Sequence, residues 1–181
     1  MTESVLGLVP FALVYGLVVA FHEFGHYGAG RWIAGIPAPN IRVVLLAFPQ
    51  HVALRDGEDW VRPWEQPRYG EIYTRYDVES ARTRYVDLYT AGGLIGQAVG
   101  VAAAVGLLFA VGERGWAELF VELSVVLTAS YFLLDLGASL RSGRNGRYAG
   151  DFSALWTHSP PGTVAVVLFF VVVHAGLSLF L

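Results

Sequence analysis

A His-Glu-Phe-Gly-His segment, residues 22–26, contains the side chains best suited to chemistry in this chain. On a helix His22 and His26 lie four residues apart, so both imidazoles project from one face and can bind one zinc ion. Glu23 lies beside them and can accept a proton from a water that the metal activates. An apolar run, residues 5–21, leads directly into the segment. The pattern predicts zinc-dependent hydrolysis inside or at the edge of a bilayer.

A zinc ion held by two histidines needs a third protein ligand and an open position for water. The chain contains no cysteine, so this ligand must be a histidine or a carboxylate. The downstream candidates are His51, Asp135, Asp151, His158 and His174.

The candidates differ in their competing roles. Asp151 precedes a short apolar stretch and could project into a bundle, although capping a helix would occupy the same oxygens. Asp135 lies within an apolar span, where pairing with an arginine or a backbone group is as good an interpretation as a functional role. We expect His174 to form a hydrogen bond between helices. His51 could contact a substrate, but we expect it to be a surface histidine.

The composition indicates a membrane protein. The chain has 181 residues, 55% of them apolar and 15% charged, whereas soluble domains have about 25% charged residues. A net charge of −3 argues against nucleic acid as a partner. The oligomeric state is left open by the sequence.

Four segments have the length and composition of transmembrane helices. They are residues 5–33, 88–111, 116–140 and 163–181. No basic residue precedes the first run, so we interpret it as a retained span and not as a secretory signal. The predicted fold is a mainly α, polytopic membrane helix bundle forming a single domain over residues 1–181.

A polar segment, residues 34–87, separates the first two spans. Its apolar and β-branched residues predict a strand pair over residues 41–55, joined by a turn at Pro49. Residues 56–67 are typical of a loop. Acidic residues and arginines alternate over residues 77–87, which favours a solvated surface helix.

Arginine placement predicts the orientation. Seven of the 12 basic residues, all of them arginines, lie between spans one and two, and three lie after span three: Arg42, Arg55, Arg62, Arg68, Arg75, Arg82, Arg84, Arg141, Arg144 and Arg147. The positive-inside rule places both of these loops in the cytoplasm and both termini outside. The metal site would then face the cytoplasmic side.

Small residues on the second span predict close helix packing. Gly92, Gly93, Gly96 and Gly100 recur at short helical spacings. Such positions let two transmembrane helices approach closely, so we expect this span to pack on the first.

Taken together, these motifs resemble those of the site-2 proteases, a family of intramembrane zinc metalloproteases. Residues 22–32 resemble the family's first core helix, and the strand-rich segment after them resembles its membrane-associated β region. Residues 91–97 are similar to the family's Ala-Gly-Pro…Asn motif, with Gly93 in place of proline and Gln97 about where asparagine is usual. Asp151 resembles the aspartate of the family's Asp-Gly motif, although phenylalanine follows it here.

The resemblance implies a mechanism and a substrate. It implies that His22, His26 and Asp151 bind Zn²⁺, with Asp135 outside the ligand set, and that Glu23 is the general base. It also implies a transmembrane or membrane-associated protein as substrate, unwound and added to the predicted strand pair. Two alternatives stay open: a zinc-binding membrane protein without protease activity, and a metal-free structural or interaction bundle.

Overall fold

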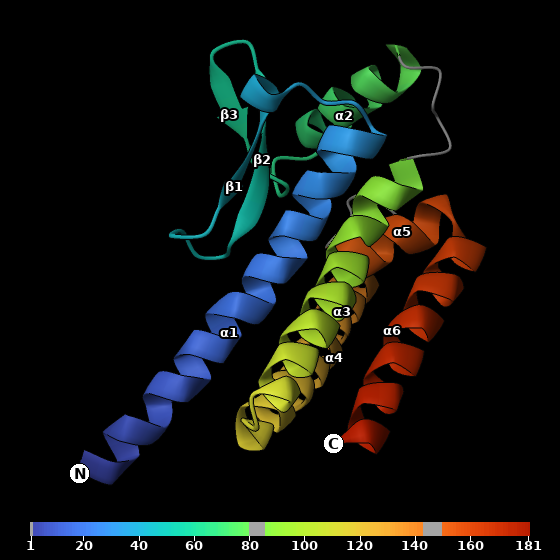
Figure 1. The fold of residues 1–181 in the computed structure, drawn as a ribbon. Coiled ribbons are helices and arrows are strands. Elements are labelled where there is room, and N and C mark those ends of the chain that lie inside the picture. The colour runs from blue at the N-terminus through green and yellow to red at the C-terminus, as the bar shows by residue number, and fades with distance from the viewer. Residues whose placement is uncertain (1, 80–85, 143–149) are drawn as a thin grey trace.

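The computed structural model describes residues 2–79, 86–142 and 150–181 and is dominated by four long helices (Figure 1). These are α1 (Thr2–Gly28), α3 (Val86–Ala110), α4 (Arg114–Ser142) and α6 (Pro160–Phe180). A π-helical turn, Ala29–Ile33, extends α1. The fold confirms the predicted mainly α bundle with a small sheet after its first helix.

Each long helix is long and apolar enough to cross a membrane. The qualifying segments are Leu8–Ile33, Leu88–Ala110, Arg114–Arg141 and Pro160–Phe180, close to the predicted spans. This indicates an integral membrane protein. Both termini and the α3–α4 connection lie at one end of the bundle, and the sheet lies at the other (Figure 1). The predicted cytoplasmic loop after α4 includes residues 143–149, which lie outside the described residues.

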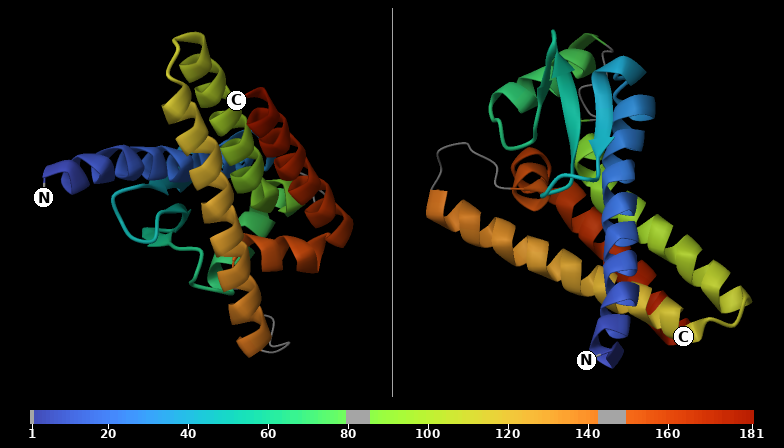
Figure 2. Two further views of the ribbon diagram at one scale, coloured as in Figure 1. Left: turned by 90° about the horizontal axis from the view of Figure 1, so that it is seen from below. Right: turned by 90° about the vertical axis from the view of Figure 1, so that its left-hand side faces the viewer.

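The helices α1 and α3 pack closely because glycines meet at their crossing. A Cβ atom added to Gly25 would lie 2.1 Å from the carbonyl oxygen of Gly92, and one added to Gly96 would lie 2.4 Å from Cα of Gly25. A Cβ atom on Gly100 would lie 2.4 Å from the ring of Phe21. The expected close packing of the first two spans is thus confirmed. Towards its N-terminus α1 diverges from α6 (Figure 2).

A three-stranded antiparallel sheet follows α1, after a short 3₁₀ turn at Ala38–Asn40. Its strands are β1 (Ile41–Val44), β2 (His51–Asp56) and β3 (Asp59–Val61), in the order β1-β2-β3. The predicted strand pair is confirmed, with Val44 opposite His51.

The third strand corrects the expectation of a loop at residues 56–67. Gly57 has a φ of +65°, which permits the two-residue turn between β2 and β3. This turn places Asp56 opposite Asp59. Arg68 donates hydrogen bonds of 2.9 Å to both carboxylates and thereby offsets their repulsion.

Two short helices complete the fold. Helix α2 (Arg68–Glu79) packs on the sheet through the buried side chains of Tyr69, Ile72 and Tyr73. A surface helix was predicted over residues 77–87. Residues 77–79 belong to the end of α2, residues 86–87 belong to the start of α3, and residues 80–85 lie outside the described residues. Helix α5 (Asp151–His158) lies between α4 and α6.

Candidate metal centre

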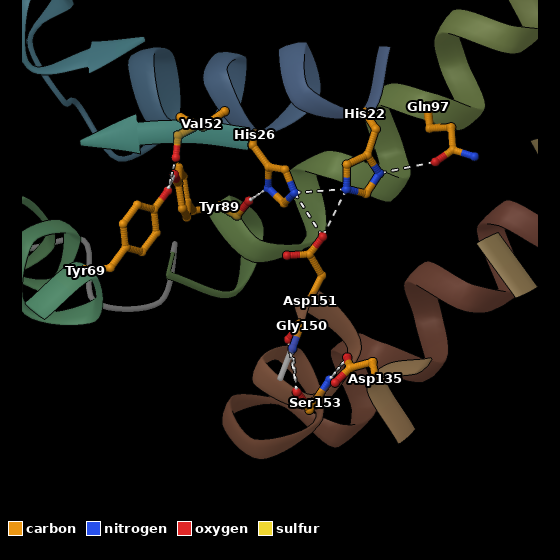
Figure 3. A network of polar contacts seen from close by, with 10 residues as sticks. All are labelled: His22, His26, Val52, Tyr69, Tyr89, Gln97, Asp135, Gly150, Asp151 and Ser153. Carbon is orange, nitrogen blue, oxygen red and sulfur yellow. Dashed lines mark hydrogen bonds and ion pairs between the residues drawn. The ribbon is translucent and has the colours of Figure 1, made fainter. Parts of the chain in front are cut away.

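Three side chains from two distant parts of the chain converge at one point (Figure 3). His22 and His26 come from α1, and Asp151 is the first residue of α5. Each histidine Nε2 lies 3.0 Å from Oδ2 of Asp151, and the two Nε2 atoms lie 3.2 Å apart. Zinc bonds of about 2.0–2.2 Å in tetrahedral geometry separate neighbouring ligand atoms by about 3.3–3.5 Å. The triangle of ligand atoms therefore has nearly the size that a zinc ion requires.

The Nδ1 atoms of both histidines, which point away from Asp151, form hydrogen bonds with oxygen atoms that can only accept a hydrogen. Nδ1 of His22 donates to Oε1 of Gln97 over 3.2 Å, and Nδ1 of His26 donates to the carbonyl oxygen of Tyr89 over 2.9 Å. Each Nδ1 therefore carries the hydrogen, and in a neutral ring Nε2 presents a lone pair. Such outer hydrogen bonds orient histidines that ligate metals. Two lone pairs and a carboxylate oxygen meeting at this distance call for a cation between them.

Asp151 is held in its charged form. Burial disfavours a carboxylate, but when a proton takes the place of a metal on Nε2 of His26, the charge of that ring and the hydrogen bonds with both histidines outweigh burial and keep the pKa of Asp151 below its usual range. A deprotonated carboxylate is the form that binds a metal.

The capping role considered for Asp151 is filled by Asp135. The backbone N–H of Ser153, in the first turn of α5, donates to Oδ2 of Asp135 over 2.8 Å. Gly150 occupies the cap position of that helix. Asp135 thus pairs with a backbone group between helices, as one of its two interpretations predicted. Asp151 is left free to face the histidines, and it is the carboxylate that the fold brings to them (Figure 3).

Gly93 lies against the histidine pair on the α3 side. A Cβ atom added there would lie 2.4 Å from Nε2 of His26 and 2.6 Å from Nε2 of His22. A side chain at this position would enter the space in which the two nitrogen atoms meet. The absence of a side chain at residue 93 therefore keeps the ligand atoms accessible.

Glu23 is buried but has no hydrogen bond or ion pair among the described residues. Its side chain is 8% exposed and lines a cavity of about 1040 Å³ together with His22, His26 and Asp151. Buried carboxyl groups are normally paired. An unpaired one beside three metal-ligating atoms is placed to meet water or a substrate.

The same cavity reaches the start of β2. His51 is 6% exposed and lines the cavity with Gln50 and Trp64. Its Nδ1 donates to the carbonyl oxygen of Pro49 over 2.9 Å, and its ring meets that of Trp64 edge-on with 4.8 Å between centroids. The expectation of a surface histidine is wrong, because His51 is the first of four consecutive buried residues at the start of β2.

The remaining candidates do not join the ligand cluster. His174 is buried in α6, and its Nε2 lies 2.9 Å from Oγ of Ser124 in α4, which confirms the expected hydrogen bond between helices. His158 is exposed near the end of α5. Sequence reasoning missed Tyr89 because its contribution is a backbone carbonyl, which no residue type reveals.

Comparisons of the chain with models of known protein families, with curated proteins and with solved structures find no match.

Proposed function

We propose that the protein is an intramembrane zinc endopeptidase of the site-2 protease type. One observation carries the proposal: His22, His26 and Asp151 converge within 3.0–3.2 Å beside the buried, unpaired Glu23. The histidines and the glutamate belong to a helix long and apolar enough to cross a membrane. Ionisable groups in such a segment are costly and mark function.

The donor set suits zinc. Two imidazole nitrogens and one carboxylate oxygen are ligands that catalytic zinc sites use, and a fourth position would stay open to the cavity. Bound there, zinc would polarise a carbonyl group and lower the pKa of a water molecule to about 7.

Glu23 is the proposed general base. It would accept a proton from the attacking water and pass it to the leaving amine. A carboxylate without a protein partner can take both roles, because no hydrogen bond has to be broken when it changes protonation state.

The proposed substrate is a transmembrane or membrane-associated protein. In the order of the three strands β1 is an edge strand, and its last residue, Val44, lies opposite the cavity-lining His51. An unwound substrate segment could add to β1 and present a peptide bond to the cavity. Leu46 and Phe48, between β1 and β2, are fully or almost fully exposed at 105% and 87%, which favours contact with lipid or a membrane protein.

The proposed active site faces the cytoplasm. The positive-inside rule assigns the arginine-rich loop between α1 and α3 to the cytoplasm, and the sheet of this loop lies at the end of the bundle opposite both termini (Figure 1).

Cleavage of tagged membrane proteins tests the proposal. Purified protein in liposomes would be incubated with a panel of single-span membrane proteins labelled at both ends. We expect cleavage that stops with a chelator, returns with zinc, and falls by about 10²-fold or more in Glu23→Gln. Glu122→Gln makes the same chemical change at an exposed position of α4 and should cleave normally.

Two results would contradict the proposal. Cleavage that persists in Glu23→Gln would exclude Glu23 as the base. One zinc per chain without cleavage of any panel member would favour the alternative of a zinc-binding membrane protein that is not a protease.

A further inference from the structure

A chain of hydrogen bonds leads from the metal centre across three helices. From His22 it passes to Gln97 in α3 over 3.2 Å, to Ser124 in α4 over 2.9 Å, and to His174 in α6 over 2.9 Å. It ends where Nδ1 of His174 meets the carbonyl oxygen of Phe170 at 2.9 Å. Gln97, Ser124 and His174 are each at most 3% exposed, and Ser124 and His174 do not line the cavity, so water does not compete for the bond between these two residues. Figure 3 shows its first bond, between His22 and Gln97.

The direction of every bond follows from the carbonyl of Phe170. A carbonyl oxygen only accepts, so Nδ1 of His174 carries the hydrogen and, in a neutral ring, Nε2 accepts. The ring is neutral because a charge buried in an apolar helix is costly. Ser124 must then donate its hydroxyl hydrogen to His174, and its oxygen is left to accept from the amide NH₂ of Gln97.

The same logic fixes the state of His22. Because the NH₂ group of Gln97 points to Ser124, Oε1 points to His22 and accepts from its Nδ1. His22 then carries its hydrogen on Nδ1 and leaves Nε2 bare, which is the tautomer that binds a metal through Nε2.

We propose that His174 is a positioning residue for the metal centre, which acts through Ser124 and Gln97 to hold His22 in its metal-binding tautomer. This inference rests on the proposed zinc site. His174 touches neither the ligand atoms nor the cavity that they line.

His174 matters because the amide of Gln97 can be reversed. A serine hydroxyl that no longer donates to His174 can donate to Oε1 of a reversed Gln97. The NH₂ group would then face His22 and demand a bare Nδ1, which puts the hydrogen on Nε2 and blocks metal binding.

One of two further contacts of Gln97 limits the effect, because the Thr128 hydroxyl can accept or donate and fits either orientation of the amide, whereas a carbonyl only accepts. Nε2 of Gln97 also lies 2.9 Å from Oγ1 of Thr128 and 3.3 Å from the carbonyl oxygen of Ser124. The carbonyl favours the same amide orientation, so removing the His174 acceptor should weaken metal binding without abolishing it.

Zinc affinity of the full chain in detergent micelles tests the proposal, measured by competition with a chromophoric chelator. His174→Phe keeps a ring next to Phe170, on which His174 stacks at 3.9 Å, but removes the acceptor. We expect it to bind zinc about tenfold more weakly, the lower end of the range for residues that support metal ligands. His174→Gln, whose Oε1 can accept from Ser124, should keep most of the wild-type affinity.

A double variant separates positioning from packing. Ser124→Ala removes the hydroxyl that would donate to a reversed Gln97, while the Ser124 carbonyl, which only accepts, still favours the original orientation of the amide. Ser124→Ala alone should bind zinc nearly normally, and Ser124→Ala with His174→Phe should recover most of the affinity that His174→Phe loses. If the phenylalanine variant does not fold, His174→Leu takes its place in the same comparison.

The outcomes distinguish this inference from the proposed function. A wild-type chain that binds no zinc would overturn the zinc site itself. Zinc binding that is equal in wild type and His174→Phe would overturn only the role of His174. A double variant as weak as His174→Phe, or weaker, would show that the loss comes from packing and would also overturn that role.

Discussion

Gly93 and His26 stand so close that a Cβ atom on the glycine would lie 2.4 Å from Nε2 of the histidine. Real Cβ atoms do not approach a nitrogen this closely, so either the helix or the imidazole would have to move. The space in which a metal would sit thus depends on α3 carrying no side chain at that point.

Gly93→Ala should therefore weaken zinc binding. We expect a loss of about tenfold or more, because the added methyl group displaces the histidines from the geometry in which their ligand atoms meet. Gly106→Ala, on the same helix but with nothing within 4 Å of the added atom, is the matched control and should bind normally. Titration of both purified variants with zinc gives the comparison, and equal affinities would show that Gly93 does not border the metal.

Asp135 and Asp151 should respond differently to substitution. Asp151→Ala removes a ligand and should abolish stoichiometric zinc binding. Asp135→Ala removes the acceptor for the N–H of Ser153, which should destabilise the first turn of α5 by about 1 kcal/mol and weaken zinc binding without abolishing it. Asp135→Asn keeps an acceptor oxygen and should stay close to wild type. The zinc content of the three variants is compared after dialysis. If Asp135→Asn lost all its zinc while Asp151→Ala kept it, Asp135 and not Asp151 would be the third ligand.

Acid should loosen the contact between α2 and the sheet. Hydrogen bonds from Arg68 and, secondarily, from Arg75 lower the pKa of Asp56 in the folded protein. A lowered folded pKa means that the stabilisation is present above the unfolded value of about 3.9 and is lost as the pH falls through the folded pKa.

Hydrogen exchange of α2 at pH 6 and pH 3, corrected for intrinsic rates, measures this effect. Protection should fall at pH 3 in the wild type and in Glu58→Gln, an exposed control on the neighbouring turn. Asp56→Asn should show the same protection at both values. A wild-type chain with unchanged protection at pH 3 would contradict the role of this ion pair.

Local patterns made part of the site predictable. His22 and His26 share a face because they are four residues apart on one helix, and no tertiary contact alters that. The glycines of α3 predicted close packing on α1 because small residues at helical spacing permit it whatever the partner. The strand pair was likewise predictable from its own β-branched and apolar residues.

Other features depend on contacts between distant residues. Asp151 lies 129 positions from His22, and only the docking of α5 against α4 decides whether it or Asp135 reaches the histidines. His51 is buried because the start of β2 packs against the rest of the fold and lines the cavity. Strand β3 was not predicted because it is short and lies in a polar segment, and the turn that joins it to β2 depends on Gly57. In α2, however, the spacing of Tyr69, Ile72 and Tyr73 could have revealed a helix with one buried face.

Metal content of the gently purified chain tests the central claim most directly. Elemental analysis should find one zinc per chain in the wild type and in His158→Ala, which alters an exposed histidine outside the cluster. It should find almost none in His22→Ala, His26→Ala and Asp151→Ala. A wild-type chain without metal, or zinc that persists in all three ligand variants, would contradict the account.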